Sequence, residues 1–232
     1  MSQPEILGVG GAIDDNPVRG RLNAVFFRMV DGYVHRLLGE RKAALFADLP
    51  DDIVELGPGT GANLRYYHPG TRLVAIEPNP HMHPALARTA KRRAINLDIL
   101  PVGAEATGLP AGSVDAVVCT LVLCTVPDPV AALAEARRIL RPNGRLLVIE
   151  HVSAPKGSVL ARLQRLLQPG WQWAFEGCDL CRPTGALLTT AGFAAVELER
   201  YRLRSLFVPV NEQVAGVATA RSDHYEPTRA NG

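Results

Sequence analysis

The central part of the chain alternates between short apolar runs and segments whose apolar residues recur every three or four positions. The runs have the length of buried strands, and the periodic segments are typical of amphipathic helices. Strands that alternate with helices form βαβ units and pair in parallel. The pattern therefore predicts an α/β fold with a largely parallel, doubly wound sheet, whose first five strands are expected at residues 53–56, 72–77, 96–102, 113–119 and 145–152.

The N-terminal part carries helical spacing before the first strand. Residues 17–39 and 40–49 are each expected to be a helix, the second ending before Pro50, while residues 1–16 are expected to be an arm that folds over a ligand or stays loose. For four apolar side chains of the first helix we favour core packing over lining of a substrate pocket. These are Phe26, Phe27, Met29 and Tyr33.

After residue 152 the alternation stops. Helices are expected at 159–167 and 184–191, with a loop at 169–181 between them, and strands at 193–203 and 213–220. No helix-length pattern separates these two strands, so they are expected to pair antiparallel. We interpret residues 1–232 as one domain. Its parts are a helical lid or arm (1–50), a cofactor-binding core (51–152), a region of substrate loop, helices and last strands (153–220) and a polar tail (221–232).

Composition narrows the functional classes. The chain has 232 residues, 47% of them hydrophobic, and a formal net charge of +2 spread along its length, so no nucleic-acid partner is expected. No apolar run approaches the roughly 18 residues of a membrane span, and the first residues lack a signal-peptide pattern. We expect no integral membrane association and a cytoplasmic location. The oligomeric state, monomer or homodimer, stays open.

Four cysteines raise the question of disulfides and metals. They are Cys119, Cys124, Cys178 and Cys181. A cytoplasmic chain of this size is expected to keep them reduced. Cys178 and Cys181 have the spacing of a metal or redox pair, but no second such pair accompanies them, so the sequence predicts no metal site.

A glycine-dense loop follows the first predicted strand. Gly57, Gly59 and Ala62 satisfy the loose dinucleotide fingerprint, which is a weak signal alone. Glu55, two residues before the first glycine, is expected to face the cleft and pair with a cationic ligand group. A nicotinamide cofactor brings an anionic pyrophosphate, so this acid favours a cofactor with an amino group and a sulfonium. Glu77 ends the second strand, where an acid accepts hydrogen bonds from ribose hydroxyls.

With these features the sequence resembles the class I S-adenosylmethionine-dependent methyltransferases. The resemblance rests on residues 55–61, on Glu77, on residues 105–115 and on residues 140–144 before the fifth strand. It implies a Rossmann-like, seven-stranded, mostly parallel sheet with helices on both faces and a C-terminal antiparallel pair. Gly103 departs from the family's usual acid, so the adenine contact is assigned to the Ala104 backbone. The implied cofactor-binding residues are Glu55, Gly57, Pro58, Gly59, Gly61, Asn63, Glu77, Pro78, Ala104, Glu105, Thr120 and Leu121.

A narrower likeness concerns the acceptor. Residues 117–126, 150–152 and 169–182 resemble the methyltransferase-like alkyl thiol S-methyltransferases. This likeness implies methyl transfer to a small, hydrophobic thiol, in detoxification or natural-product biosynthesis. The alternatives are an O- or N-methyltransferase of a small metabolite such as a quinone or polyketide, and a cofactor-binding protein without catalysis.

Methylation of a thiol requires the enzyme mainly to position the sulfur and to favour the loss of its proton. In-line displacement requires the nucleophile about 3 to 3.5 Å from the methyl carbon, and ionising a thiol of pKa about 8.5 costs roughly 2 kcal/mol at pH 7. The candidate catalytic residues are His151, at the end of the fifth strand, and Asp179, in the loop at 169–181, called the aromatic loop because it carries two tryptophans and a phenylalanine. Their alternative roles are a hydrogen bond to a loop carbonyl for His151 and a helix cap for Asp179. Trp171, Trp173 and Phe175 are expected either to form a lid or to pack in the core.

Overall fold

The computed structural model describes residues 17–222, so the predicted arm at 1–16 and most of the predicted tail lie outside the described residues. The sheet consists of seven strands. These are β1 (Asp52–Leu56), β2 (Arg72–Ile76), β3 (Asn96–Leu100), β4 (Val114–Thr120), β5 (Leu140–His151), β6 (Ala195–Arg202) and β7 (Glu212–Thr219). The helices are α1 (Pro17–Leu45), α2 (His83–Arg93), α3 (Pro129–Ile139), α4 (Val159–Ala174) and α5 (Thr184–Thr190), with 3-10 turns η1 (Leu64–Tyr66) and η2 (Val208–Val210).

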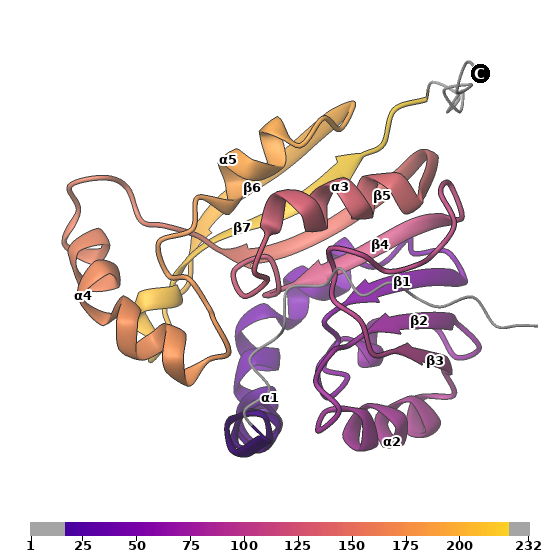
Figure 1. The fold of residues 1–232 in the computed structure, drawn as a ribbon, viewed down its shortest axis with the longest axis horizontal. Helices are drawn as coiled ribbons and strands as arrows, with labels where there is room; N and C mark the ends of the chain where they lie inside the picture. Colours follow the sequence, from indigo (N-terminus) through magenta and orange to yellow (C-terminus); the bar gives the residue numbers. More distant parts are fainter. Residues whose placement is uncertain (1–16, 223–232) are drawn as a thin grey trace, which may run out of the picture.

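The strand order indicates where on the sheet a ligand would bind. The order is β3-β2-β1-β4-β5-β7-β6, with the first five strands parallel and β7 antiparallel to both neighbours. This confirms the predicted fold class. The order reverses between β1 and β4, and ligands of open α/β sheets bind at the carboxyl ends of the strands at such a point. The N-terminal half of α1 and helix α4 lie at that end of the sheet (Figure 1).

Two hydrophobic cores cover the two faces of the sheet because strand side chains alternate in direction. On one face Val54 of β1 packs with Leu133 of α3 and Leu188 of α5. On the other face Ile53 packs with Phe46, just after α1, and with Leu86 of α2. Figure 1 shows α3 and α5 on one side of the sheet and α2 on the other. This layering fixes the strand ends on which the site is built.

The N-terminal helix differs from the prediction. Helix α1 is continuous through Gly39 to Leu45, where a break had been expected. Only its C-terminal half packs on the sheet, because the N-terminal half extends past the strand ends. Met29 is therefore exposed, which corrects its expected core packing, whereas Phe26 packs against the rings of Phe175 and Phe207.

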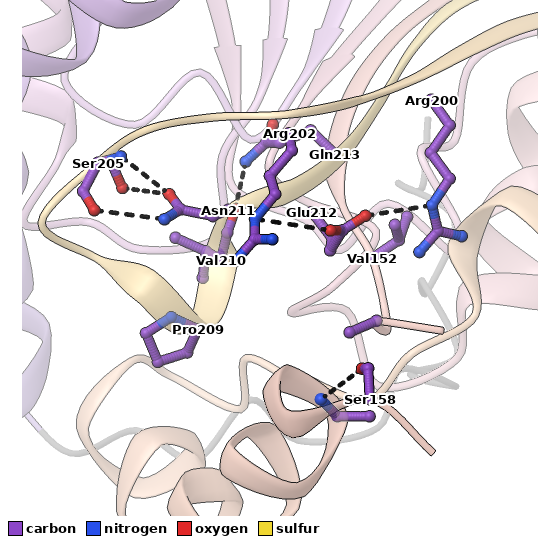
Figure 2. Close-up of polar contacts among 12 residues, drawn as sticks. Val152, Ser158, Arg200, Arg202, Ser205, Pro209, Val210, Asn211, Glu212 and Gln213 are labelled. Atoms are coloured by element: carbon purple, nitrogen blue, oxygen red, sulfur yellow. Dashed lines mark hydrogen bonds and ion pairs between the residues drawn. The ribbon is translucent and has the colours of Figure 1, made fainter. Parts of the chain in front are cut away.

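The predicted aromatic loop also differs, because α4 continues through Pro169 to Ala174. Gln164 anchors this helix: its Nε2 donates to the carbonyls of Val152 (3.2 Å) and Pro209 (2.9 Å). The corner between β6 and β7 is held by ion pairs of Arg200 and Arg202 with Glu212 (Figure 2). Through Gln164, helix α4 is thus tied to the end of β5 and to η2. Among the described helices, none has the length and apolar character needed to cross a membrane.

Candidate active site

A cavity of about 1000 Å³ lies at the carboxyl ends of β1, β2, β3 and β4. Loops from all four strands form its floor, and α1 and α4 form its opposite wall. The floor is lined by Gly57, Gly59, residues 76–82, residues 103–105, Leu121, Val122 and residues 125–127. The opposite wall is lined by Arg19, Gly20, Phe27, Pro169, Gln172, Trp173, residues 175–177 and Arg182.

The glycine loop has the backbone of a close-approach site. Gly57 adopts φ +58°, and a Cβ there would lie 2.6 Å from Cγ2 of Val122. Gly59 adopts φ +57°, but a Cβ there would meet no atom within 4 Å, because this residue faces the cavity. Leu121 also adopts a left-handed φ of +58°, which is costly for a residue with a side chain and is typical of functional sites. The loop can therefore bring its backbone against a ligand.

Glu77 joins this loop to the cavity. Its Oε2 accepts a hydrogen bond from the Gly59 N–H and its Oε1 accepts one from the Asn79 N–H, both at 2.9 Å. The side chain lines the cavity although only 5% of the residue is exposed. Burial raises the pKa of Glu77, while the two backbone donors oppose that shift. Each oxygen keeps acceptor capacity, so the carboxylate can also bind a ligand's hydroxyl groups.

A second carboxylate, which the sequence did not single out as a ligand, lies beside Glu77. Glu176 lines the same cavity and accepts a hydrogen bond from Asn79 Nδ2 at 3.0 Å. Burial and the charge of Glu77 raise its pKa to about 7. Its left-handed φ of +49° adds backbone strain to this electrostatic cost. A cationic ligand group would relieve the repulsion between the two acids.

Glu55, the other predicted acid, lies elsewhere. It is 1% exposed and is not on the cavity wall, which corrects the expectation that it faces the cleft. Asn63 Nδ2 donates to its Oε1 at 2.7 Å and Tyr67 Oη donates to its Oε2 at 2.8 Å, while Lys42 Nζ donates to Asn63 Oδ1 at 2.7 Å. Burial raises the pKa of Glu55 to about 7 and lowers that of Lys42 to about 8. This buried network ties α1 to β1.

The other predicted cofactor residues divide in the same way. Five line the cavity besides Glu77 and Gly59: Gly57, Pro78, Ala104, Glu105 and Leu121. Four do not: Pro58, Gly61, Asn63 and Thr120. Gly61 instead packs on α2, where a Cβ would lie 3.1 Å from Leu86 Cδ1. At position 103 a Cβ would lie 2.7 Å from Glu105 Oε2, the end of a flexible side chain that could move aside.

The predicted catalytic residues lie behind the cavity wall rather than on it. His151 is buried with its Nε2 3.1 Å from Cys178 Sγ, and neither side chain is part of the cavity lining. A hydrogen bond from Cys124 and the proximity of His151 lower the pKa of Cys178 to about 5, although burial opposes this. Burial lowers the pKa of His151, but the contact with Cys178 outweighs it and raises that pKa above its usual value.

Asp179 has a structural role in a turn. Its Oδ1 accepts a hydrogen bond from the Cys181 N–H at 2.8 Å, and its Oδ2 lies 3.7 Å from Arg182 Nε. It does not cap α5, whose N-cap is Pro183 and has no side-chain hydrogen bond. Asp179 itself lies outside the cavity lining, although its partner Arg182 belongs to it.

Comparison with known proteins assigns this chain to a family. A family model described as a methyltransferase domain matches residues 54–148. The chain is 39% identical over 169 residues to human thiol S-methyltransferase TMT1B, covering 72% of this chain and 69% of the human protein. The chain belongs to the thiol S-methyltransferase family. It is also 33% identical over 192 residues to human thiol S-methyltransferase TMT1A, covering 78% of this chain and 79% of that protein.

A solved structure supports the fold of this thiol S-methyltransferase family member. It is described as an S-adenosylmethionine-dependent methyltransferase, possible histamine N-methyltransferase, from Thermotoga maritima. The two structures align with a TM-score of 0.60 at 21% identity, covering 88% of this chain and 99% of that one. At this identity the likeness concerns the fold alone.

The cavity of this family member fits S-adenosylmethionine, the cofactor of its methyltransferase class. The observation that tests the fit is Gly59: the left-handed backbone leaves open cavity space where any side chain would project. The acids Glu77 and Glu176 suit a cofactor that carries an amino group and a sulfonium. The cavity volume of about 1000 Å³ leaves room for a small second substrate beside the cofactor.

Proposed function

We propose that this protein transfers the methyl group of S-adenosylmethionine to the sulfur of a small hydrophobic thiol. The observation that carries the proposal is a cavity with two chemically different walls. Glu77 lies on the floor beside the glycine loop, and an aromatic wall opposite it is formed by Phe27 of α1, Trp173 of α4 and Phe175 just after α4. An acid beside the glycine loop suits a cationic donor and an aromatic wall suits an apolar acceptor.

The donor is held by the floor of the cavity in this proposal. Glu77 accepts hydrogen bonds from the ribose hydroxyls, the backbone from Gly57 to Gly59 approaches the amino-acid end, and Ala104 contacts the adenine. When bound, S-adenosylmethionine supplies a methyl group already activated by its sulfonium. The chain's own task is then to hold the acceptor sulfur in line, to exclude water and to ease the loss of its proton.

The acceptor is placed near the segments that carry Cys124 and Cys178. Thr125 and Gly177, their chain neighbours, line the cavity. A thiol of pKa about 8.5 loses its proton at a cost of roughly 2 kcal/mol at pH 7. A polar group buried close behind the cavity wall is therefore enough to favour this loss of the proton. We assign this influence to His151, acting through its neighbours. A direct general-base role for His151 or Asp179 stays a prediction.

Biological context is left to experiment. A cytoplasmic location, a role in detoxification or natural-product biosynthesis, and a monomeric or homodimeric state stay predictions from the sequence. An oxygen or nitrogen acceptor, such as a quinone or polyketide, is the alternative outcome of the assay below.

The test is transfer of labelled methyl groups to a matched panel of acceptors. Each thiol is paired with the alcohol and amine of the same carbon skeleton, and product is measured at pH 7.5. We expect turnover on hydrophobic thiols that exceeds turnover on the paired alcohols and amines at least tenfold. Transfer to the oxygen or nitrogen partners alone would remove the thiol assignment, and cofactor binding without any turnover would show a binding protein.

A further inference from the structure

Three side chains from three distant segments meet behind the cavity wall. Cys124 follows β4, His151 ends β5 and Cys178 follows α4. One ligand atom from each, the two Sγ atoms and a ring nitrogen, lies within 4.8 Å of the others. Their exposed fractions are 2%, 2% and 7%, so the group is shielded from bulk water.

We propose that Cys124, His151 and Cys178 bind one zinc ion, with the fourth coordination position open to the thiolate of the methyl acceptor. The metal part of this proposal stands on the cluster alone. The acceptor part rests on the proposed function, because it identifies the thiol as the fourth ligand.

The donor set favours zinc over hard cations. Two thiolates and one imidazole suit zinc and other soft ions, whereas magnesium and calcium prefer oxygen ligands. Two thiolates also neutralise the charge of a divalent ion, which lowers the free-energy cost of burying the ion away from water. Three protein ligands with one open position are typical of catalytic zinc, whereas structural zinc sites are closed by four.

The surroundings of the cluster support the same arrangement. Trp171 Nε1 donates a hydrogen bond to Cys178 Sγ at 3.3 Å, a contact of the kind that orients a ligating thiolate. The Nε2 atom of His151 is directed at Cys178. A metal bound at Nε2 would account for this ring orientation.

The open position is assigned to the acceptor because the cysteine-bearing segments also form the cavity wall, through Thr125 and Gly177. Zinc deprotonates a coordinating thiol. The acceptor sulfur releases its proton to solvent and keeps the electron pair. That pair forms the new bond to the methyl carbon, while the bond from this carbon to the sulfonium sulfur breaks and its pair stays on that sulfur. The product is a neutral thioether, a weaker ligand that can leave.

Cys181 offers a matched control within the same loop. The spacing of Cys178 and Cys181 suggests a pair, yet Cys181 is not part of the cluster. Its N–H is held by Asp179 in the turn. The partners of Cys178 come instead from the ends of β4 and β5, where no local spacing could reveal them.

The test is metal content after reconstitution with zinc and removal of excess ion. We expect a single tightly held equivalent in the wild type and in Cys181→Ser, and at least a tenfold loss of retained zinc in Cys124→Ser and Cys178→Ser. Wild-type zinc content in both of these variants, or no retained zinc in the wild type, would overturn the site.

Cobalt substitution in the wild type keeps the test independent of whether the variants fold. The expected spectrum contains thiolate-to-cobalt charge-transfer bands that intensify when a small alkyl thiol is added, and the paired alcohol leaves them unchanged. A cobalt spectrum without thiolate bands would overturn the ligand set. Bands that do not respond to the thiol would overturn the open position.

The two proposals can fail separately. Full thiol methylation by metal-free protein would overturn the acceptor part and leave the proposed function standing. Bound zinc in a protein that methylates only oxygen or nitrogen acceptors would overturn the acceptor part and the proposed function together, leaving the metal site.

Discussion

Glu55 and Glu77 stand at the ends of neighbouring strands and have opposite surroundings. Glu77 lines the cavity and accepts two backbone hydrogen bonds, from the loop that it supports and from its own turn. Glu55 lies inside the protein, where Asn63 and Tyr67 each donate to one of its oxygens. One acid is available to a ligand and the other is used by the fold.

The difference follows from which face of the sheet each residue occupies. Glu55 is still within β1 and shares the face of Ile53, which packs toward Phe46 and Tyr67. Glu77 comes after β2 has ended, where the chain turns over the strand ends. Glu55, which pairs with Ala75 two residues before Glu77, is therefore a structural group. Glu77, just past the end of its strand, can contact a ligand. The experiments below divide cavity-facing from buried groups.

The largest effect is expected at the cavity-facing glycine. Gly59→Val should weaken S-adenosylmethionine binding by about 100-fold or more, because the branched side chain would fill the space that the ligand needs. Gly112→Val is the matched control, since Gly112 has φ +58° against +57° for Gly59 and also has no atom within 4 Å of its Cβ position. Both variants carry similar backbone strain. Calorimetric titration should show lost binding only at Gly59, and equal losses would mean that strain rather than contact is responsible.

The buried acid should be visible in stability. The Glu55 pKa is about 7 in the native protein against 4.5 for an ordinary glutamate. Between these values the native state holds a proton that the unfolded chain releases, so the stability contribution of Glu55 falls as pH rises from 4.5 to 7, by about 3 kcal/mol. Lys42, with a pKa of about 8, titrates above this window.

The measurement for Glu55 is urea unfolding from pH 5 to pH 7. Glu77 and Glu176 also have raised pKa values, so the relevant quantity is the difference in unfolding free energy between wild type and Glu55→Gln. We expect the unfolding free energy of the variant to increase relative to that of the wild type as pH rises through this range. A difference that does not change with pH would contradict the buried, uncharged environment.

His151 lies off the cavity, as Glu55 does, but it should affect turnover. His151→Ala is expected to lower kcat/KM for a thiol about tenfold or more at pH 7 and less at pH 9, because an acceptor of pKa about 8.5 ionises by itself at the higher pH. Cofactor affinity and melting temperature serve as controls for the fold. An equal loss at both pH values would mean that His151 does not assist ionisation.

The smallest effect is expected at the rim of the aromatic wall. Trp173 lines the cavity although 71% of the residue is exposed. Trp173→Ala should raise KM about fivefold for a long-chain or aromatic thiol, equivalent to about 1 kcal/mol of lost apolar contact, with little change for a two-carbon thiol. Leu166→Ala, also exposed on α4 but off the cavity wall, should leave both KM values unchanged. An equal change for both thiols would place Trp173 outside the acceptor's contacts.

The fold was predictable because apolar periodicity reports burial directly. The five parallel strands and the antiparallel pair overlap the ranges that the apolar runs predicted, although β5 begins at Leu140, five residues before its expected start. The continuity of α1 was not predicted from the sequence, because a glycine such as Gly39 often marks the end of a helix. Here residues of α1 before and after Gly39 pack on the sheet, and the helix continues through it. Similarly, Pro169 does not end α4.

The site was only partly predictable, because ligand contact depends on direction as well as position. The glycine loop and Glu77 lie on the cavity wall, as the motif predicted. Glu55, Gly61 and Asn63 carry the motif's spacing but point into the core or onto α2. Glu176 and the cluster of Cys124 with Cys178 depend on contacts between distant segments, which the sequence pattern does not encode locally.

The most direct test of the account is S-adenosylmethionine affinity in two matched variants, Glu77→Gln and Glu55→Gln. Both changes keep the size of the side chain and remove its ability to ionise. The account predicts that Glu77→Gln raises Kd at least tenfold, while Glu55→Gln changes Kd less than twofold. A Kd that rises in Glu55→Gln and stays at the wild-type value in Glu77→Gln would contradict it.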